Sequence, residues 1–176
     1  MNWIQRALAL LTAAMLSTAA YSQNDAAQQV IRSLHWVNGP GLVNVGTNAK
    51  FQIPDGYTFL DAPDTRRFLE EVTHNSSNGS EYFFGPADGR WWATFRYDAT
   101  GHVSDDEKID APALLKSMQE NQAADNNNRK SKGWPQLLNM NWKYPPFYDP
   151  GTRRLEWAVS FISSDTNQVA VNYETR

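Results

Sequence analysis

Residues 42–60 read LVNVGTNAKFQIPDGYTFL, and this stretch decides the fold class. Leu42–Val45 and Ala49–Ile53 are short, apolar-rich segments on either side of a Gly-Thr-Asn turn, a spacing typical of a compact β-hairpin. A Pro-Asp-Gly turn follows and leads directly into Tyr57–Leu60, which has the composition of a third strand. Three strands in succession, with no helix between them, indicate an antiparallel sheet.

Two helices interrupt this strand pattern. Asp61 is a good N-cap residue for a helix over Ala62–Thr73, and Asp110 occupies the same place before a second helix that ends by Gly133. The other strands are predicted over residues 81–85, 91–97, 137–144, 154–162 and 168–173. We therefore predict an α+β fold, a mainly antiparallel β-sheet with two principal helices packed on it.

The remaining segments are less regular. Residues 23–29 are polar and predicted to be frayed, and residues 30–37 fit either a short helix or a strand. Pro145-Pro146 opens a predicted long turn that reaches Thr152. Neither an internal repeat nor an interdomain linker is visible, so residues 23–176 are predicted to form a single domain.

Composition limits the classes of protein to consider. The chain has 176 residues, of which 41% are hydrophobic and 12% aromatic, as in a folded globular protein rather than a disordered one. Its formal net charge of −3 excludes a generally basic nucleic-acid binder, so we expect no nucleic-acid partner.

Residues 1–22 have the pattern of a secretory signal peptide. Arg6 supplies the positive charge, Ala7–Ala20 is apolar, and Ala20 and Ser22 are the small residues that precede a cut at Gln23. The apolar run is shorter than the roughly 20 residues that cross a bilayer, which favours cleavage over retention as an anchor. The expected location is the bacterial periplasm, with membrane association as the alternative.

Familiar catalytic and metal-binding motifs are missing from the sequence. It has no cysteine, and its three histidines lack metal-ligand spacing, so we expect no catalytic residue, metal or cofactor. The densest acidic stretch, Asp105-Asp106-Glu107, has two interpretations. Its carboxylates favour the positive end of the following helix, or, with His102 nearby, they are the acid and base of an envelope-acting hydrolase.

Tryptophan is unusually frequent, with seven in the chain. Trp91 and Trp92 are adjacent on a predicted strand, so their indoles are expected on opposite sides of the sheet. Either both faces are covered, or one indole is exposed and can stack on a sugar or clamp a peptide. The candidate ligand-binding residues are those of this strand and of the polar stretch after it: Trp91, Trp92, Tyr97, His102, Asp105 and Asp106.

Characteristic segments follow one another along most of the chain: Gly46–Tyr57, Trp92–Tyr97, Gly101–Asp106, Leu114-Leu115, Asn126–Arg129, Gly133, Trp142, Pro146–Asp149, Leu155–Ala158 and Val171–Tyr173. Together they resemble the bacterial domain of unknown function 2167, a family of predicted membrane-anchored proteins. The resemblance implies an exported, membrane-associated domain and supplies no activity or ligand. It also implies a longer chain with a C-terminal anchor, so we expect a truncated form whose last strand has an unpaired edge.

Three functions are compatible with this sequence. The first is a non-catalytic periplasmic binding or accessory module, whose partner is an unknown envelope component and whose longer relatives associate with the inner membrane. The second is the hydrolase that uses the acidic stretch. The third is a structural protein that assembles through a sheet edge. The ligand and the oligomeric state are not specified by the sequence.

Overall fold

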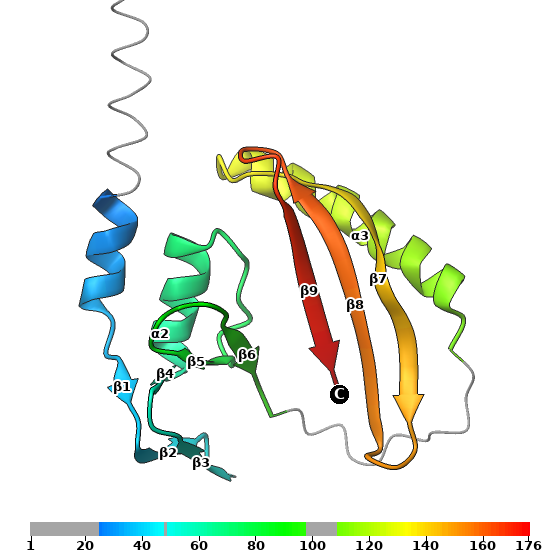
Figure 1. The fold of residues 1–176 in the computed structure, drawn as a ribbon. Helices are drawn as coiled ribbons and strands as arrows, with labels where there is room; N and C mark the ends of the chain where they lie inside the picture. Colours follow the sequence, from blue (N-terminus) through cyan, green and yellow to red (C-terminus); the bar gives the residue numbers. More distant parts are fainter. Residues whose placement is uncertain (1–24, 48, 98–108) are drawn as a thin grey trace, which may run out of the picture. The chain divides into compact units, whose positions relative to one another are not determined.

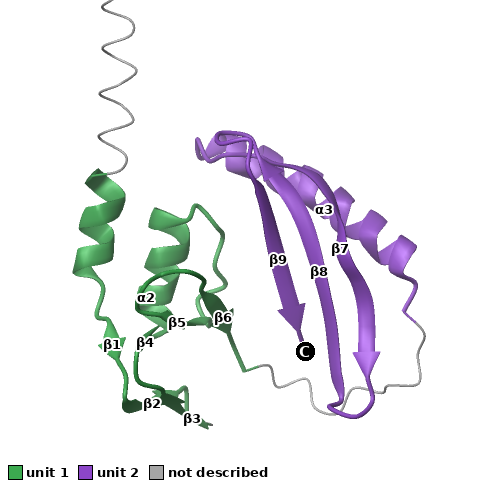
Figure 2. Cartoon of the chain, in the orientation of Figure 1, with its two compact units in different colours: residues 1–99 green, residues 100–176 purple. Residues whose placement is uncertain are grey.

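A computed structural model of the chain describes residues 25–47, 49–97 and 109–176. The chain divides into two compact units, an N-terminal unit of residues 1–99 and a C-terminal unit of residues 100–176 (Figure 2). Each unit combines helical segments or a helix with antiparallel strands, which confirms the α+β class. The prediction of a single domain stays a prediction.

The N-terminal unit contains a sheet in the order β1-β4-β5-β6 and a separate hairpin of β2 and β3. The strands are β1 (Val37–Asn38), β2 (Gly41–Val45), β3 (Ala49–Ile53), β4 (Tyr57–Leu60), β5 (Tyr82–Pro86) and β6 (Ala93–Phe95). The hairpin and β4 form where the sequence of residues 42–60 predicts strands, but the three strands do not share one sheet: β4 pairs with β1 and β5, and the hairpin stays separate. Gly46 begins the hairpin turn with φ 58°, a left-handed conformation that favours glycine.

The helices of this unit differ in detail from the prediction. Residues 25–33 are helical, so the expectation of a frayed segment over residues 23–29 is wrong for residues 25–29. The helix is held because Val30 packs against the core of the unit. The helix predicted over Ala62–Thr73 has nearly the predicted extent. It consists of α2 (Ala62–Arg67), which continues as a wider π-helical turn, η1 (Phe68–Val72).

Both faces of the four-stranded sheet are covered. Successive residues of β5 point to opposite faces, so Phe83 packs with the helices and Phe84 with the hairpin. The helix side contains a buried core of Leu34, Leu60, Phe68, Leu69 and Phe83. On the hairpin side, the ring of Phe51 contacts three rings of the sheet, those of Phe59, Phe84 and Phe95.

The C-terminal unit is one helix and a three-stranded antiparallel sheet in the order β7-β8-β9. Its elements are α3 (Ala111–Ser131), β7 (Leu137–Asp149), β8 (Arg154–Ser163) and β9 (Val169–Thr175). Asp110 caps α3 as predicted, because its Oδ1 accepts a hydrogen bond from the Ala113 N–H at 3.0 Å.

The predicted long turn over residues 145–152 is wrong. Strand β7 continues through Pro145 and Pro146 to Asp149. The register shifts between Tyr144 and Phe147, so both prolines lie at a bulge of an edge strand, where a missing N–H removes no ladder hydrogen bond.

Helix α3 runs along β7 (Figure 1). The Asn126 side chain brackets the backbone of Leu137, donating to its carbonyl at 2.7 Å and accepting from its N–H at 2.9 Å. Gln119 Nε2 donates to the Met140 carbonyl at 2.9 Å. These amides satisfy backbone groups at the start of an edge strand, so α3 covers part of this sheet edge.

Candidate functional site

The predicted strand over residues 91–97 is shorter in the structure. Its ladder with β5 begins at Ala93, and Trp91 and Trp92 lie just before it. The backbone passes very close to Gly85 at this point: a Cβ atom there would lie 2.8 Å from the Trp91 carbonyl oxygen. The close approach therefore depends on a residue without a side chain.

The two indoles lie on opposite sides of the sheet, as predicted. Trp91 contacts Phe84 and Tyr57, with ring centroids 5.9 and 6.0 Å apart, whereas Trp92 stacks on Phe83 at 6.2 Å and meets Phe68 edge-on at 5.7 Å. Both remain well exposed, at 46% and 41%. Each indole therefore offers an aromatic surface backed by other rings, but the two do not converge on one ligand.

The other predicted site residues are not brought to this place. Tyr97 follows β6 and is 62% exposed. His102, Asp105, Asp106 and Glu107 lie outside the described residues. The ligand-binding set and the acid–base alternative that depend on them stay predictions.

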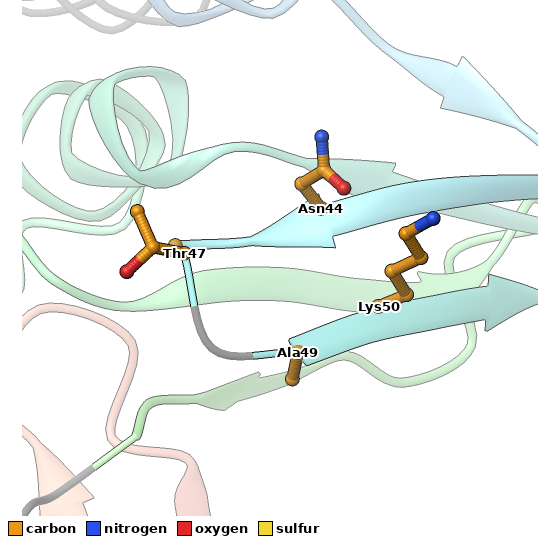
Figure 3. A pocket seen from close by; sticks show the side chains of 5 residues that line it. Asn44, Thr47, Ala49 and Lys50 are labelled. Atoms are coloured by element: carbon orange, nitrogen blue, oxygen red, sulfur yellow. The ribbon is translucent and has the colours of Figure 1, made fainter.

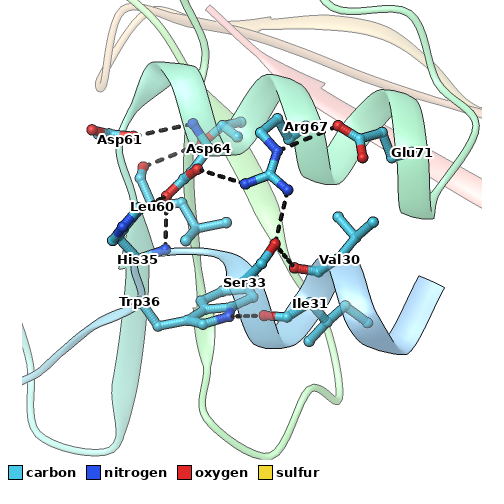
Figure 4. A network of polar contacts seen from close by, with 11 residues as sticks. Val30, Ile31, Ser33, His35, Trp36, Leu60, Asp61, Asp64, Arg67 and Glu71 are labelled. Carbon is cyan, nitrogen blue, oxygen red and sulfur yellow. Dashed lines mark hydrogen bonds and ion pairs between the residues drawn. The ribbon is translucent and has the colours of Figure 1, made fainter. Parts of the chain in front are cut away.

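A buried carboxylate that sequence reasoning did not single out joins α2 to the segment after the N-terminal helix (Figure 4). Asp64 is 5% exposed, and its Oδ2 accepts from the His35 backbone N–H at 2.7 Å and lies 2.8 Å from His35 Nδ1. Arg67 Nη1 lies 3.5 Å from Asp64 Oδ1, and Nη2 donates to Ser33 Oγ at 2.8 Å. Asp64 also lies in the first turn of α2, where a carboxylate favours the positive end of the helix.

The protonation of Asp64 follows from these contacts. Burial by itself raises the pKa of Asp64, but the hydrogen bonds from His35 and the charges of His35 and Arg67 outweigh it, so the pKa lies below its usual range. Burial likewise raises the pKa of Glu81, and hydrogen bonds from Ser77 and the backbone N–H of Asn78 outweigh it. Both carboxylates are held ionised.

Two carboxylates of the C-terminal unit behave in the same way. A hydrogen bond from the Thr152 hydroxyl, with one from the Gly151 N–H, lowers the pKa of Asp149, and a hydrogen bond from the Ser163 hydroxyl lowers the pKa of Asp165. A general acid at neutral pH needs a raised pKa instead. These carboxylates are therefore suited to holding turns in place.

A hollow of about 510 Å³ lies at the tip of the β2–β3 hairpin (Figure 3). Its lining includes Asn44 and Lys50, which are cross-strand partners, and also Gly46, Thr47 and Ala49. Among the described residues of this lining, Lys50 is the one that titrates. A single ammonium group beside an amide can bind an anion weakly, but it does not supply an acid–base pair.

One face of the β7–β8–β9 sheet carries large apolar side chains in contact with solvent. The register aligns Tyr144, Ala158 and Tyr173 in one row across the three strands, and Leu138, Ile162 and Val169 in another. Side chains directly opposite in a ladder share a face. We call this surface the open face; its exposed large apolar residues are Leu138, Tyr144, Phe147, Val169, Val171 and Tyr173.

The other face of the same sheet is the one that α3 contacts. Trp142 and Val159 are paired on this face, and Trp142 Nε1 donates to the Ala111 carbonyl of α3 at 3.3 Å. Trp157, two residues from Val159 on β8, is 8% exposed and Val159 is 3% exposed. Sequence reasoning missed the open face because alternation along a strand does not tell which of its two sides a helix covers.

The described residues, 25–47, 49–97 and 109–176, offer neither a metal site nor a membrane-spanning helix. Among the described residues, no three His, Asp or Glu side chains lie close enough together to hold a metal ion. Within the same ranges, no helix is both long and apolar enough to cross a membrane.

Most of the chain matches a known protein family. The model of the family described as "Protein of unknown function (DUF2167)" matches residues 37–176. The chain belongs to this family. This confirms the resemblance inferred from the sequence. No curated protein and no solved structure matches the chain.

Some of the features described above lie within the residues that the DUF2167 model matches, and others precede them. The open face, both exposed indoles and Asp64 lie inside the matched range. The N-terminal helix and His35 precede it. A function common to the DUF2167 family therefore has to be sought in the features within residues 37–176.

Proposed function

We propose that the chain is a non-catalytic binding module of the bacterial cell envelope, and that its open face binds an apolar surface of an envelope protein. The observation that carries the proposal is the contrast between the two sides of the β7–β8–β9 sheet. One side packs against α3, and the other holds Tyr144, Phe147 and Tyr173 at 60%, 64% and 54% exposure.

The chemistry of the open face fits an apolar partner. Charged side chains gather at one end of it, where Arg154 Nε lies 3.5 Å from Glu156 Oε1. A hydrogen bond with Glu156 raises the pKa of Tyr173, so this phenol stays protonated near neutral pH. Contiguous apolar surface of this kind commonly marks a protein interaction site, because burying it from water is favourable.

Two further observations support the envelope and the absence of catalysis. Residues 1–22 have the pattern of an export signal, which places the mature chain in the periplasm under this proposal. Among the described residues, which do not include Asp105–Glu107, the carboxylates with displaced pKa values are all displaced downward, away from the range that a general acid uses: Asp64, Glu81, Asp149 and Asp165.

Site-specific photo-crosslinking in cells tests the proposal. A photoreactive benzoylphenylalanine replaces Phe147 on the open face or, as the control, Lys116, whose side chain is 78% exposed on α3. We expect a crosslinked product of discrete mass from position 147 in the envelope fraction, and none from position 116. The same products from both positions, or none from position 147, would contradict the proposal.

A second variant shows whether the product depends on the face itself. With the photoreactive residue at Phe147, the substitution Tyr144→Lys places a charge among the apolar side chains, and the crosslinked product should fall at least fivefold. Lys116→Glu in the same background should leave it unchanged. An equal yield in both variants would assign the crosslink to some other surface.

A further inference from the structure

The two edges of the β7–β8–β9 sheet differ. The edge of β7 is bonded by side chains of α3 at Leu137 and Met140. Strand β9 pairs with β8 on one side, and no other strand within the described ranges pairs with its second side. An uncovered strand edge presents backbone N–H and C=O groups that another strand can bind.

The ladder shows which groups of β9 point outward. Leu155 and Arg176 exchange two backbone hydrogen bonds of 2.9 Å, so the N–H and C=O of Arg176 point toward β8. The Ser163 N–H donates to the Gln168 carbonyl in the same register. Because these directions alternate along an antiparallel strand, the outward groups belong to every second residue: Val169, Val171, Tyr173 and Thr175.

This edge lacks the devices that usually prevent pairing. Strand β9 reads VAVNYET, without lysine or proline, and its ladder with β8 is unbroken from Val169 to Thr175. Edge strands commonly carry a lysine, a proline or a bulge that blocks addition of another strand. The β7 edge, by contrast, has two prolines, register shifts and a covering helix.

We propose that the free edge of β9 pairs with β9 of a second copy of this chain, antiparallel and about a two-fold axis at Asn172. In this register Val171 lies opposite Tyr173 of the second copy, and Val169 lies opposite Thr175 of the second copy. All four outward-pointing residues then form hydrogen-bonded pairs. Moving the axis to Val171 or to Tyr173 leaves an outward-pointing residue of β9 without a partner in the opposite β9.

The side chains fit a second copy in the same register. Val and Tyr directly opposite each other form an aromatic and β-branched pair, which is favourable across strands. The single carboxylate of β9, Glu174, lies opposite Ala170 of the second copy, so no like charges meet. The pairing also joins the open faces of the two copies into one surface. Binding of a partner to that joined surface rests on the proposed function, whereas the pairing of the two β9 strands does not.

The expected complex is weak and depends on concentration. A seven-residue edge buries much less surface than the roughly 1,200–2,000 Å² of a stable interface. The dimer should therefore form at high protein concentration and dissociate on dilution.

A single introduced cysteine tests the register, because the chain has no cysteine of its own. Asn172→Cys would place two thiols directly opposite each other, at a Cα separation of about 4.5 Å that a disulfide can bridge. Ala170→Cys is the matched control: it lies on the same side of the same exposed strand, but its counterpart is four residues away along the strands. With mild oxidation of the purified full chain, we expect a disulfide-linked dimer at least tenfold more abundant for Asn172→Cys.

Equal yields of dimer from the two cysteine variants, or no dimer from either, would overturn the proposal. Sedimentation of the full chain gives an independent measure. Val171→Pro removes an outward N–H without touching the β8 ladder, and it should abolish the dimer seen at high concentration. A dimer that survives Val171→Pro would also overturn the proposal. Neither the disulfide yield nor the sedimentation measurement needs an envelope partner. The dimer can therefore be absent while the photo-crosslink at Phe147 is present, and it can be present while the photo-crosslink is absent.

Discussion

The four-stranded sheet of the N-terminal unit and the three-stranded sheet of the C-terminal unit differ in how their faces are covered. In the N-terminal unit, helices cover the Phe83 side of the sheet and the β2–β3 hairpin covers the Phe84 side. In the C-terminal unit, α3 covers the side of Trp142, and the other side leaves Tyr144 and Phe147 in solvent. Most aromatic rings of the N-terminal sheet thus pack on its two covered faces, with Trp91 and Trp92 exposed beside them, whereas Tyr144, Phe147 and Tyr173 of the C-terminal sheet all lie in solvent.

The edges of the C-terminal sheet repeat this asymmetry on a smaller scale. The β7 edge is bonded by Gln119 and Asn126 of α3, whereas in the described chain the second side of β9 pairs with no other strand and β9 carries no lysine or proline. An open face next to an uncovered edge gives the C-terminal unit the features of an interaction surface.

Matched phenylalanine substitutions should give the largest difference between the units. Phe59 is 2% exposed and contacts the rings of Phe51 and Tyr82, so Phe59→Ala should lower the free energy of unfolding by about 4 kcal/mol. Phe147→Ala on the open face should change it by less than about 0.5 kcal/mol. Urea unfolding followed by circular dichroism measures both. Similar losses would mean that the Phe147 ring is packed.

The Asp64 network gives the next effect. Asp64→Asn should lower the unfolding free energy at pH 7 by about 2 kcal/mol, because buried hydrogen bonds lose a charged acceptor. The folded pKa of Asp64 lies below its usual value, so its stabilisation is complete above about pH 4 and is lost as the pH falls through the folded pKa. Unfolding at several pH values should show the difference between wild type and variant shrinking toward pH 3. An unchanged difference would contradict the charge effect.

Asn126 tests how the β7 edge is covered. Asn126→Ala removes both hydrogen bonds to Leu137 and should cost about 1–2 kcal/mol relative to Asn127→Ala. Asn127 is exposed on the same helix, so the control variant gains the same helix propensity and keeps both hydrogen bonds between Asn126 and Leu137. The difference between the two unfolding midpoints measures the contribution of the two Asn126–Leu137 hydrogen bonds. Equal midpoints would mean that Asn126 does not stabilise this edge.

The smallest expected stability change belongs to the open face. Tyr144 is 60% exposed, so Tyr144→Lys should alter the unfolding free energy by less than about 0.5 kcal/mol. The same variant should bind the apolar dye anilinonaphthalene sulfonate at most half as well as wild type does, because the charge interrupts the apolar rows. Fluorescence titration with the dye measures this. Unchanged dye binding would place the dye site elsewhere.

Much of the fold follows from local signals in the sequence. The hairpin of residues 42–53 was predictable from its Gly-Thr-Asn turn, and Asp61 and Asp110 both cap helices as expected. Hairpin turns and helix caps can be predicted from one sequence because they depend on residues that are neighbours along the chain. The Pro145-Pro146 prediction failed because tolerance of proline depends on being an edge strand, which is a property of the sheet.

The candidate site was harder to predict for a related reason. Trp91 and Trp92 were correctly assigned to opposite sides, since adjacent residues alternate in extended chain. Strand β9 also alternates, with Val169, Val171 and Tyr173 on one side. Which side stays open depends on where α3 packs, and α3 is too polar along its length to show that in the sequence.

Hydroxyl-radical footprinting of the open face tests the central claim most directly. The chain is oxidised in purified form and in intact cells, and the modification of Tyr144, Phe147 and Tyr173 is read by mass spectrometry, with exposed Trp91 as the internal control. We predict strong oxidation of the three open-face residues in the purified chain and at least fivefold protection in cells, with Trp91 unchanged. Equal oxidation of the open face in both preparations, or protection already in the purified chain, would contradict it.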